Sequence, residues 1–433
     1  MGYRGNGGRS MGMTMAEKIL ARASGRRGVK PGDYVTARVD QVMSQEAFAE
    51  VYGMLKEEGV ERVWDPSKIA ILLDHYVPAP SVAQAEVHKL IREGVKKYRI
   101  EGWHDMQAGI CHQIMGEKGH IIPGELVLGT DSHSTTYGAF GAAGAGIGVS
   151  EMAYVLATGE LWMRVPFTIK FVIKGNLPER VTSKDIILFI AGKYTTAVAQ
   201  YKAIEFKGPT VERMSIASRM TMANMGVELG AKFAFFEADQ KTIDYLHKYV
   251  KEGEKKRVGI FKADPDARYE QEYEIDVSRL EPQVAFPHDV GNVRPISAVG
   301  EVRVDQAFLG SCTNGRFEDL EIAAAILKGK RVHAETRLIV FPASWEIYLE
   351  ALREGILEIL IEAGAVICNP GCGPCLGGHM GLLAAGERCI ASSNRNFKGR
   401  MGSTEAEVYL GSPATVAASA LAGRIVDPRQ SKR

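Results

Sequence analysis

The sequence is poor in cysteine, in charge of one sign and in long apolar runs. It has only 6 cysteines in 433 residues, which argues against a disulfide scaffold and favours reduced thiols or metal ligands. No apolar stretch reaches the roughly 18 residues of a membrane span, and the residues after Met1 lack the apolar region of a signal peptide. The formal net charge is +1 without a basic stripe, so neither a nucleic acid nor a membrane is implied as a partner. These absences together predict a cytoplasmic protein.

Apolar runs alternate with helical patterns along a chain of ordinary globular composition. Hydrophobic residues make up 45% and charged residues 24%, and the length alone suggests about three domains. Strand-like runs such as Ile69–Leu73 and Ala307–Leu309 are separated by segments such as Phe317–Leu327, whose apolar residues recur at the helical period. This alternation predicts an α/β fold with mainly parallel sheets flanked by helices. We place the three α/β domains at residues 14–165, 166–295 and 296–433.

Two segments of unusual composition mark expected boundaries. The start of the chain is rich in glycine and has no apolar period, so we expect residues 1–13 to be a disordered leader. Thr14 and Glu17 then form a capping-box signature, which predicts the first helix. Proline and glycine cluster between Pro282 and Pro295, between two patterned regions. This segment is the best candidate for a linker.

Three of the cysteines have a spacing and a setting suited to metal ligation. Cys372 and Cys375 form a Cys-Gly-Pro-Cys pair, and Cys312 lies in a Gly-Ser-Cys-Thr-Asn segment. By itself the pair also fits a redox dithiol or half of a zinc site. Thiolates are the usual ligands of iron–sulfur clusters, and three thiolates on a four-iron cube leave one iron open to polarise a substrate oxygen. The remaining cysteines are expected to be buried (Cys368, Cys389) or to form part of a site wall (Cys111).

Clusters of reactive side chains directly follow several of the apolar runs. Four of them are Asp74-His75, Asp131-Ser132-His133, Ser311-Cys312-Thr313-Asn314 and Ser392-Ser393-Asn394-Arg395. In open α/β sheets, ligands bind at the carboxyl ends of the strands. We therefore expect these clusters to form converging walls of one site. The glycine-rich stretch Gly138–Gly148 lacks the G-x-G-x-x-G order of a dinucleotide site, so it is expected to allow close packing or a tight turn near that site.

From about Met15 to Pro428 the chain resembles the aconitase superfamily. The resemblance rests on Leu73–His75, Gly109–Gln113, Gly129–His133, Asn224–Glu228, Gly310–Asn314, Pro370–Cys375 and Ser393–Arg400. Within the superfamily the chain is most similar to the large subunits of the isopropylmalate isomerase and homoaconitase type. The resemblance implies three α/β/α domains around a central 4Fe-4S cluster held by Cys312, Cys372 and Cys375.

The same resemblance implies roles for the other motif residues. It assigns catalysis to Asp74, His75, His112, Asp131 and Glu228. It assigns substrate binding to Gln45, Ser132, His133, Asn224, Asn394, Arg395 and Arg400. Asp74 with His75, and Asp131 with His112, would each join a carboxylate to an imidazole and raise the imidazole pKa. The forked guanidinium groups suit substrate carboxylates, and an expected helix over Ser218–Gly230 would put Asn224 and Glu228 on one face.

The implied activity is that of a hydro-lyase that isomerises a malate-type hydroxy acid by dehydration and rehydration. The favoured substrate is isopropylmalate, as in leucine biosynthesis, and homoaconitate and 2,3-dimethylmalate are open alternatives. A non-catalytic iron–sulfur or RNA-binding relative is a further alternative, which the neutral composition disfavours. The family's catalytic serine is carried on a further α/β domain, and the chain ends about thirty residues past Arg400. We therefore expect a separate small subunit that supplies the serine and the specificity residues.

Overall fold

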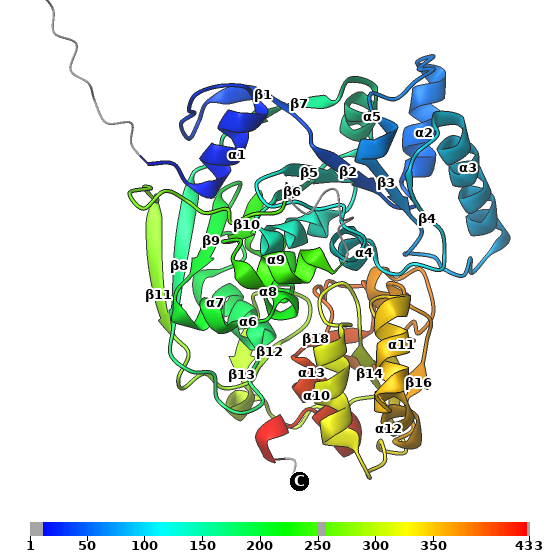
Figure 1. Cartoon of the computed structure of the whole chain (residues 1–433). Coiled ribbons are helices and arrows are strands. Elements are labelled where there is room, and N and C mark those ends of the chain that lie inside the picture. Colours follow the sequence, from blue (N-terminus) through cyan, green and yellow to red (C-terminus); the bar gives the residue numbers. More distant parts are fainter. Residues whose placement is uncertain (1–11, 249–256, 431–433) are drawn as a thin grey trace, which may run out of the picture.

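The computed structural model describes residues 12–248 and 257–430, and four β-sheets organise them (Figure 1). The first sheet has five parallel strands in the order β4-β3-β2-β5-β6. These are β4 (Gly102–His104), β3 (Ile69–Leu72), β2 (Gln41–Ser44), β5 (Leu126–Gly129) and β6 (Ala143–Gly146). The strands β2, β3 and β5 are buried at every position, as expected where helices cover both faces of a parallel sheet.

Helices and a short ribbon surround this first sheet. The helices are α1 (Met15–Ala23), α2 (Phe48–Glu57), α3 (Val82–Tyr98), α4 (Cys111–Glu117) and α5 (Val149–Thr158), with the 3-10 segments η1 (Pro66–Lys68) and η2 (Ser132–Phe140). The ribbon is an antiparallel pair of β1 (Tyr34–Arg38) and β7 (Glu160–Arg164). The first helix begins as predicted, because the Thr14 N–H donates to the Glu17 carboxylate over 2.8 Å and the Glu17 N–H donates to Thr14 Oγ1.

The second sheet has four parallel strands in the order β10-β9-β8-β11. They are β10 (Phe233–Phe236), β9 (Ala203–Lys207), β8 (Thr168–Lys174) and β11 (Gln271–Asp276). The helices of this region are α6 (Ser183–Tyr194), α7 (Pro209–Arg213), α8 (Ile216–Asn224) and α9 (Gln240–His247). The short 3-10 turn η3 (Val227–Leu229) comes directly after α8 in the chain. In Figure 1 this green region lies on the left of the view, beside the first sheet and the yellow-to-red C-terminal region.

The third sheet has seven strands in the order β13-β12-β18-β17-β14-β15-β16. They are β13 (Val293–Pro295), β12 (Gln283–Ala285), β18 (Glu407–Leu410), β17 (Arg388–Ala391), β14 (Gln306–Leu309), β15 (Arg337–Val340) and β16 (Val366–Ile367). Its helices are α10 (Phe317–Leu327), α11 (Trp345–Arg353), α12 (Ile356–Glu362) and α13 (Pro413–Ala422), with η5 (Ile296–Ala298), η6 (Gly373–Leu376) and η7 (Pro428–Gln430). The strands from β14 to β18 run parallel, so the α/β class with mainly parallel sheets is confirmed.

The prediction of a linker from Pro282 to Pro295 is wrong. Strands β12 and β13 occupy both ends of that segment and pair with each other in antiparallel register, and β12 also contacts β18. Pro295 is tolerated because β13 is the edge strand, where a missing N–H breaks no ladder. Both strands belong to the third sheet although they precede residue 296. The division of the chain into three domains at the stated boundaries stays a prediction.

A second local difference concerns the helix expected over Ser218–Gly230. Helix α8 ends at Asn224, and the short turn η3 follows it. Gly226 lies between them, where an added Cβ would stand 2.4 Å from the Ala234 Cβ on strand β10. Gly226 therefore packs closely against β10, and Asn224 and Glu228 belong to different elements.

Glycines let η2 pack directly against its neighbours. A Cβ at Gly138 would lie 1.8 Å from the Ala234 carbonyl oxygen, and one at Gly144 would lie 2.1 Å from the Ser134 carbonyl oxygen. The close packing expected of the glycine-rich stretch is thus present, and it brings the first and second sheets together beside η2.

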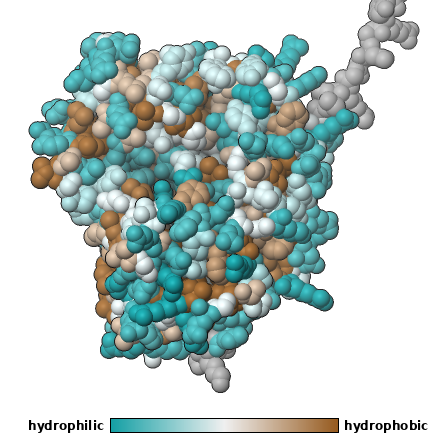
Figure 2. Space-filling view, turned by 180° about the vertical axis from the view of Figure 1, so that it is seen from behind, coloured by the Kyte–Doolittle hydropathy of each residue, from teal (hydrophilic) through white to brown (hydrophobic). Residues whose placement is uncertain are grey.

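The ends and the surface add little to the site. Residues 1–11 of the predicted leader lie outside the described residues, whereas Gly12 pairs with Ala267 and the Met13 N–H donates to Asp264. Within the described ranges no helix is both long enough and apolar enough to span a membrane. The face in Figure 2 is a mosaic of hydrophilic and hydrophobic residues.

Candidate active site

The carboxyl ends of strands β3, β5, β14 and β17 deliver side chains to one cavity. Its empty volume is about 310 Å³. The lining residues are His75, Ile110, Cys111, His112, Asp131, His133, Cys312, Cys372, Cys375, Leu376, Asn394 and Arg400. Nine of these belong to the site residues expected from the sequence, and they come from positions up to 325 residues apart (75 to 400). The convergence of strand ends on one site is therefore confirmed.

The three cysteines of interest reach the cavity from two loops. Cys312 follows β14 through Gly310 and Ser311, whose φ angles are 154° and 71°. Cys372 precedes η6, and its N–H donates to the Asp74 carbonyl oxygen over 3.0 Å. Cys375 lies in η6, and its N–H donates to the Cys372 carbonyl oxygen. All three are buried, so the backbone fixes the thiols at one wall.

Two buried asparagine amides address the Cys312 sulfur. Asn224 Nδ2 lies 3.2 Å and Asn394 Nδ2 lies 3.3 Å from Cys312 Sγ. The two side chains are also joined, because Asn394 Nδ2 donates to Asn224 Oδ1 over 3.2 Å. Burial and the nearby Cys375 and Asp131 raise the pKa of Cys312 to about 12, against the effect of the Asn224 donor. A thiol in this setting becomes a thiolate when a metal cation binds it.

The other cysteines lie outside this arrangement or only border it. Cys111 lines the cavity, as expected of a wall residue. Cys389 is buried as predicted, in strand β17. The prediction that Cys368 is buried is wrong, because its side chain is half-buried after the edge strand β16.

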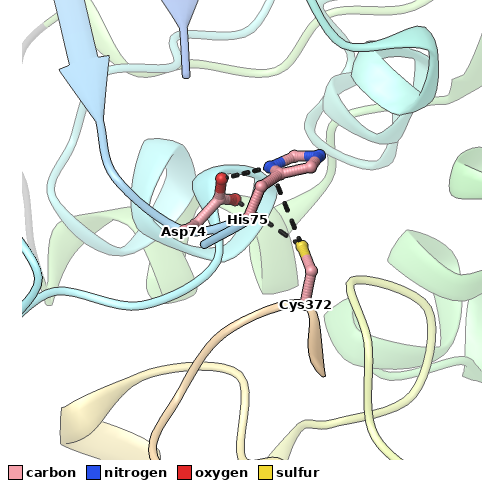
Figure 3. A group of neighbouring side chains, drawn as sticks. All are labelled: Asp74, His75 and Cys372. Carbon is pink, nitrogen blue, oxygen red and sulfur yellow. Dashed lines mark hydrogen bonds and ion pairs between the residues drawn. The ribbon is translucent and has the colours of Figure 1, made fainter. Parts of the chain in front are cut away.

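Asp74 and His75 follow strand β3 and meet Cys372 from the third sheet (Figure 3). His75 Nδ1 lies 2.5 Å from Asp74 Oδ1, and the Cys111 N–H donates to Asp74 Oδ2 over 2.7 Å. Cys372 Sγ lies 4.0 Å from both Asp74 Oδ2 and His75 Nδ1. Burial would raise the pKa of Asp74, but the charge and hydrogen bond of His75 lower it overall. Asp74 is therefore an anion that fixes the imidazole orientation.

A second carboxylate–imidazole pair lies beside the first. His112 Nε2 is 2.8 Å from Asp131 Oδ1, and Asp131 Oδ2 is 3.4 Å from His75 Nε2. The His133 N–H donates to Asp131 Oδ1 over 2.7 Å, which caps η2. Burial alone would raise the pKa of Asp131, but hydrogen bonds from His112, His133 and His75 hold it well below its usual value. One carboxylate thus joins three imidazole-bearing residues.

Glu228, Arg395 and Ser132 extend this network beyond His133. His133 Nε2 lies 2.8 Å from Glu228 Oε1, and Arg395 Nε forms an ion pair with the same oxygen at 2.7 Å. Arg395 Nη1 donates to Ser132 Oγ over 3.0 Å. These residues are linked to the cavity through His133.

Arg400 lines the cavity without a protein partner for its buried nitrogen. Its Nε has no hydrogen-bond partner, and the ion pairs found among the described residues do not include Arg400. A buried guanidinium nitrogen left unpaired costs free energy, and a carboxylate is its best-matched acceptor. The cavity is therefore prepared for an anionic ligand.

Glu46 is a member of the site that the sequence analysis missed. It follows strand β2, which pairs with β3, and its Oε1 accepts the N–H groups of His75 and Tyr76 at 3.0 Å each. Its Oε1 also lies 3.7 Å from Nε2 of buried His88. Its position just after a strand could have indicated a site residue in the sequence. The expected substrate residue Gln45 instead turns to its own backbone, where its Oε1 accepts the Ala47 N–H, and it is not among the residues that line the cavity.

Comparison with known proteins gives the same class as this geometry. The family model described as "Aconitase family (aconitate hydratase)" matches residues 17–423. Because the match spans almost the whole chain, the protein belongs to the aconitase family, whose members typically bind an iron–sulfur cluster.

Individual relatives are similar over nearly their full lengths. The "3-isopropylmalate dehydratase large subunit 1" of Methanopyrus kandleri is 53% identical over 424 residues, which cover 97% of this chain and 99% of that protein. The "Probable 3-isopropylmalate dehydratase large subunit" of Methanothermobacter thermautotrophicus is 50% identical and covers 98% and 100%. The "Probable methanogen homoaconitase large subunit" of the same organism is 47% identical and covers 96% and 98%.

Proposed function

We propose that this chain is the large, cluster-bearing subunit of a hydro-lyase that interconverts 2- and 3-isopropylmalate by dehydration and rehydration, a step of leucine biosynthesis. The observation that carries the proposal is the meeting of Cys312, Cys372 and Cys375 with two carboxylate–imidazole pairs in one cavity. The choice of substrate is supported by relatives of that name at 53% and 50% identity.

The donor set fits an iron–sulfur cluster better than a single metal ion. Asp74, His75 and Cys372 have ligand atoms within 4.8 Å of one another and could hold one ion. Such an ion would leave Cys312 and Cys375 unused, although two asparagine amides are directed at the Cys312 sulfur. When bound by the three cysteines, a 4Fe-4S cluster supplies one iron without a protein ligand as a Lewis acid for a substrate hydroxyl.

The two imidazole pairs provide proton transfer to the leaving hydroxyl. Asp74 holds His75 through Nδ1, so the Nε2 edge of His75 remains for exchange with a ligand or with Asp131. Such a positioned acid contributes typically about 10²–10⁴ in rate. Asp131 acts through His112 and His75 and is therefore a positioning residue.

The cationic wall would bind the substrate carboxylates. Arg400 offers a buried and unpaired guanidinium nitrogen to the cavity. Arg395 is held by Glu228 and Ser132, so its orientation is fixed before a ligand arrives. The forked guanidinium of Arg400 suits a substrate carboxylate and gives it a defined orientation.

A small subunit would complete the reaction. Dehydration needs a base for the C–H proton, and among the described residues no serine lines the cavity. The relatives are named large subunits, which supports a heteromer in which the partner provides the catalytic serine and closes the site against water.

Homoaconitate is the second candidate substrate, favoured by the relative of that name at 47% identity. The test is to compare kcat/KM for 3-isopropylmalate, homoaconitate, 2,3-dimethylmalate and citrate with one reconstituted preparation of both subunits. Each added or missing methylene in a pocket changes the transition-state free energy by about 1–3 kcal/mol. We expect 3-isopropylmalate to be preferred. Preference for homoaconitate would select the second candidate, and citrate faster than any malate derivative would contradict both.

A further inference from the structure

Helix α6 carries a fully buried lysine that ends against the site. Lys184 has no exposed surface, and its Nζ lies 2.6 Å from the Ser392 carbonyl oxygen and 2.5 Å from the Ser393 carbonyl oxygen. These two residues follow strand β17 and directly precede Asn394. The lysine therefore joins the helix of one sheet to the loop of another sheet, 208 residues along the chain.

A buried ammonium group in this position costs free energy unless nearby negative charge offsets it. Removing a cation from water is unfavourable, and a buried lysine is normally paired with an acid. The ion pairs found among the described residues do not include Lys184. The adjacent Asp185 is used elsewhere, since it accepts the N–H groups of Gln283 and Thr182. The two carbonyl oxygens accept hydrogen bonds from Lys184 but carry no full negative charge to balance its own.

Buried acids and the site cysteines offset the charge of Lys184. Burial lowers the pKa of Lys184 to about 7, and the charges of Asp319, Asp185, Cys375 and Cys312 act in the opposite direction. Burial raises the pKa of Asp319 and of Asp185 to about 6, so both carboxyls are mostly ionised at pH 7. Cysteine thiolates would add to this negative charge once they hold a metal.

The contact also determines where Asn394 points. The Lys184 ammonium fixes the carbonyls of the two residues before Asn394. Asn394 Nδ2 then reaches Cys312 Sγ at 3.3 Å, and Cys375 Sγ lies 3.7 Å from Asn394 Oδ1. Side chains that orient metal ligands from outside commonly tune how strongly the metal is held.

We propose that Lys184 is a positioning residue for the cluster site, which orients Asn394 on the Cys312 sulfur and offsets the charge of the cysteine thiolates. This inference rests on the proposed function, because it assumes that the three cysteines hold a cluster. Helix α6, which packs in the region of the second sheet, would thereby contribute to a metal site formed by loops of the third sheet.

The test compares Lys184→Met, Lys184→Gln and the control Lys193→Met in the full chain after anaerobic reconstitution. Lys193 is exposed on the same helix, so its variant controls for changes in α6 alone. The readouts are the rate of iron loss to a chelator and the reduction potential of the cluster. We expect Lys184→Met to retain iron about 10- to 100-fold less well and to shift the potential to a more negative value, because a nearby positive charge is lost. Lys184→Gln keeps donors for the carbonyls, so it should retain iron better than the Met variant but show the same direction of potential shift.

The outcomes separate this inference from the proposed function. If the wild-type chain and Lys193→Met bind no cluster, the proposed function fails. If both bind a cluster and the two Lys184 variants match them in iron retention and potential, the inference about Lys184 fails and the proposed function stands. Should Lys184→Met not fold, Lys184→Gln carries the charge test by itself, since an unchanged potential would overturn the proposal.

Discussion

Neutralising Asp131 should slow the reaction without removing the cluster. Asp131 accepts hydrogen bonds from His112 Nε2 at 2.8 Å and from the His133 N–H at 2.7 Å. A hydrogen bond to a charged group contributes about 1.5–3 kcal/mol, against about 0.5–1.5 kcal/mol for a neutral one. Asp131→Asn has the same shape, so it weakens each bond by about 1–1.5 kcal/mol. The sum of about 2–3 kcal/mol corresponds to a fall in kcat of about 30- to 150-fold.

The assay is the hydration of the unsaturated diacid by the reconstituted chain together with its small subunit. Asp276→Asn is the matched control, because Asp276 is exposed at a strand end and its Oδ1 also accepts the N–H two residues on, from Ser278, over 2.8 Å. Iron content should be the same in both variants and in the wild type, whereas Asp131→Asn should also unfold at a lower temperature because these bonds belong to the folded state. An Asp131→Asn enzyme with full iron content and an unchanged kcat would refute the reasoning that this carboxylate orients the imidazoles.

Three further predictions concern the substrate, stability and the partner. Arg400→Lys keeps the charge but loses the forked guanidinium, so KM should rise about 10- to 100-fold. The exposed Arg388→Lys control should leave KM unchanged, and equal KM values for Arg400→Lys and the wild type in steady-state kinetics would contradict the role of Arg400. Burial and the neighbouring Asp40 raise the pKa of Glu125 to about 7, whereas its pKa in the unfolded chain is about 4.3. The folded state therefore loses stability as the pH rises between these two pKa values. Glu125→Gln should therefore raise the free energy of unfolding by up to about 3 kcal/mol at pH 8 and by little near pH 4; a variant less stable than the wild type at pH 8 in denaturant titrations would contradict this. The isolated reconstituted chain should show no hydration activity until the small subunit is added, and full activity alone would refute the split site.

The strand ends of the site could be predicted because each depends on local sequence. The apolar run expected at Ile69–Leu73 corresponds to β3, and the helix expected over Phe317–Leu327 is α10 with the same bounds. Apolar runs define buried strands, and the parallel arrangement then brings their carboxyl ends together. The placement of His75, Asp131 and Cys312 around one cavity follows from those rules.

The parts that could not be predicted depend on contacts between distant segments. Nothing near Lys184 in the sequence indicates that its ammonium group meets the Ser392 carbonyl oxygen 208 residues later. Helix α8 ends at Asn224, and the close approach of Gly226 to strand β10 cannot be predicted from the helical period of the segment. Pro295 resembled a linker residue because an edge strand and a loop tolerate proline equally well.

The central claim is that all three cysteines hold one cluster, and the iron and sulfide content of Cys312→Ser tests it most directly. Cys312 lies outside the Asp74, His75 and Cys372 group, so a single ion bound there would not need it. We expect about four irons in the reconstituted wild-type chain, the same content in the control Cys368→Ser, and loss of the cluster in Cys312→Ser. One tightly bound metal ion per chain, retained in Cys312→Ser, would show that the three cysteines do not hold a common cluster.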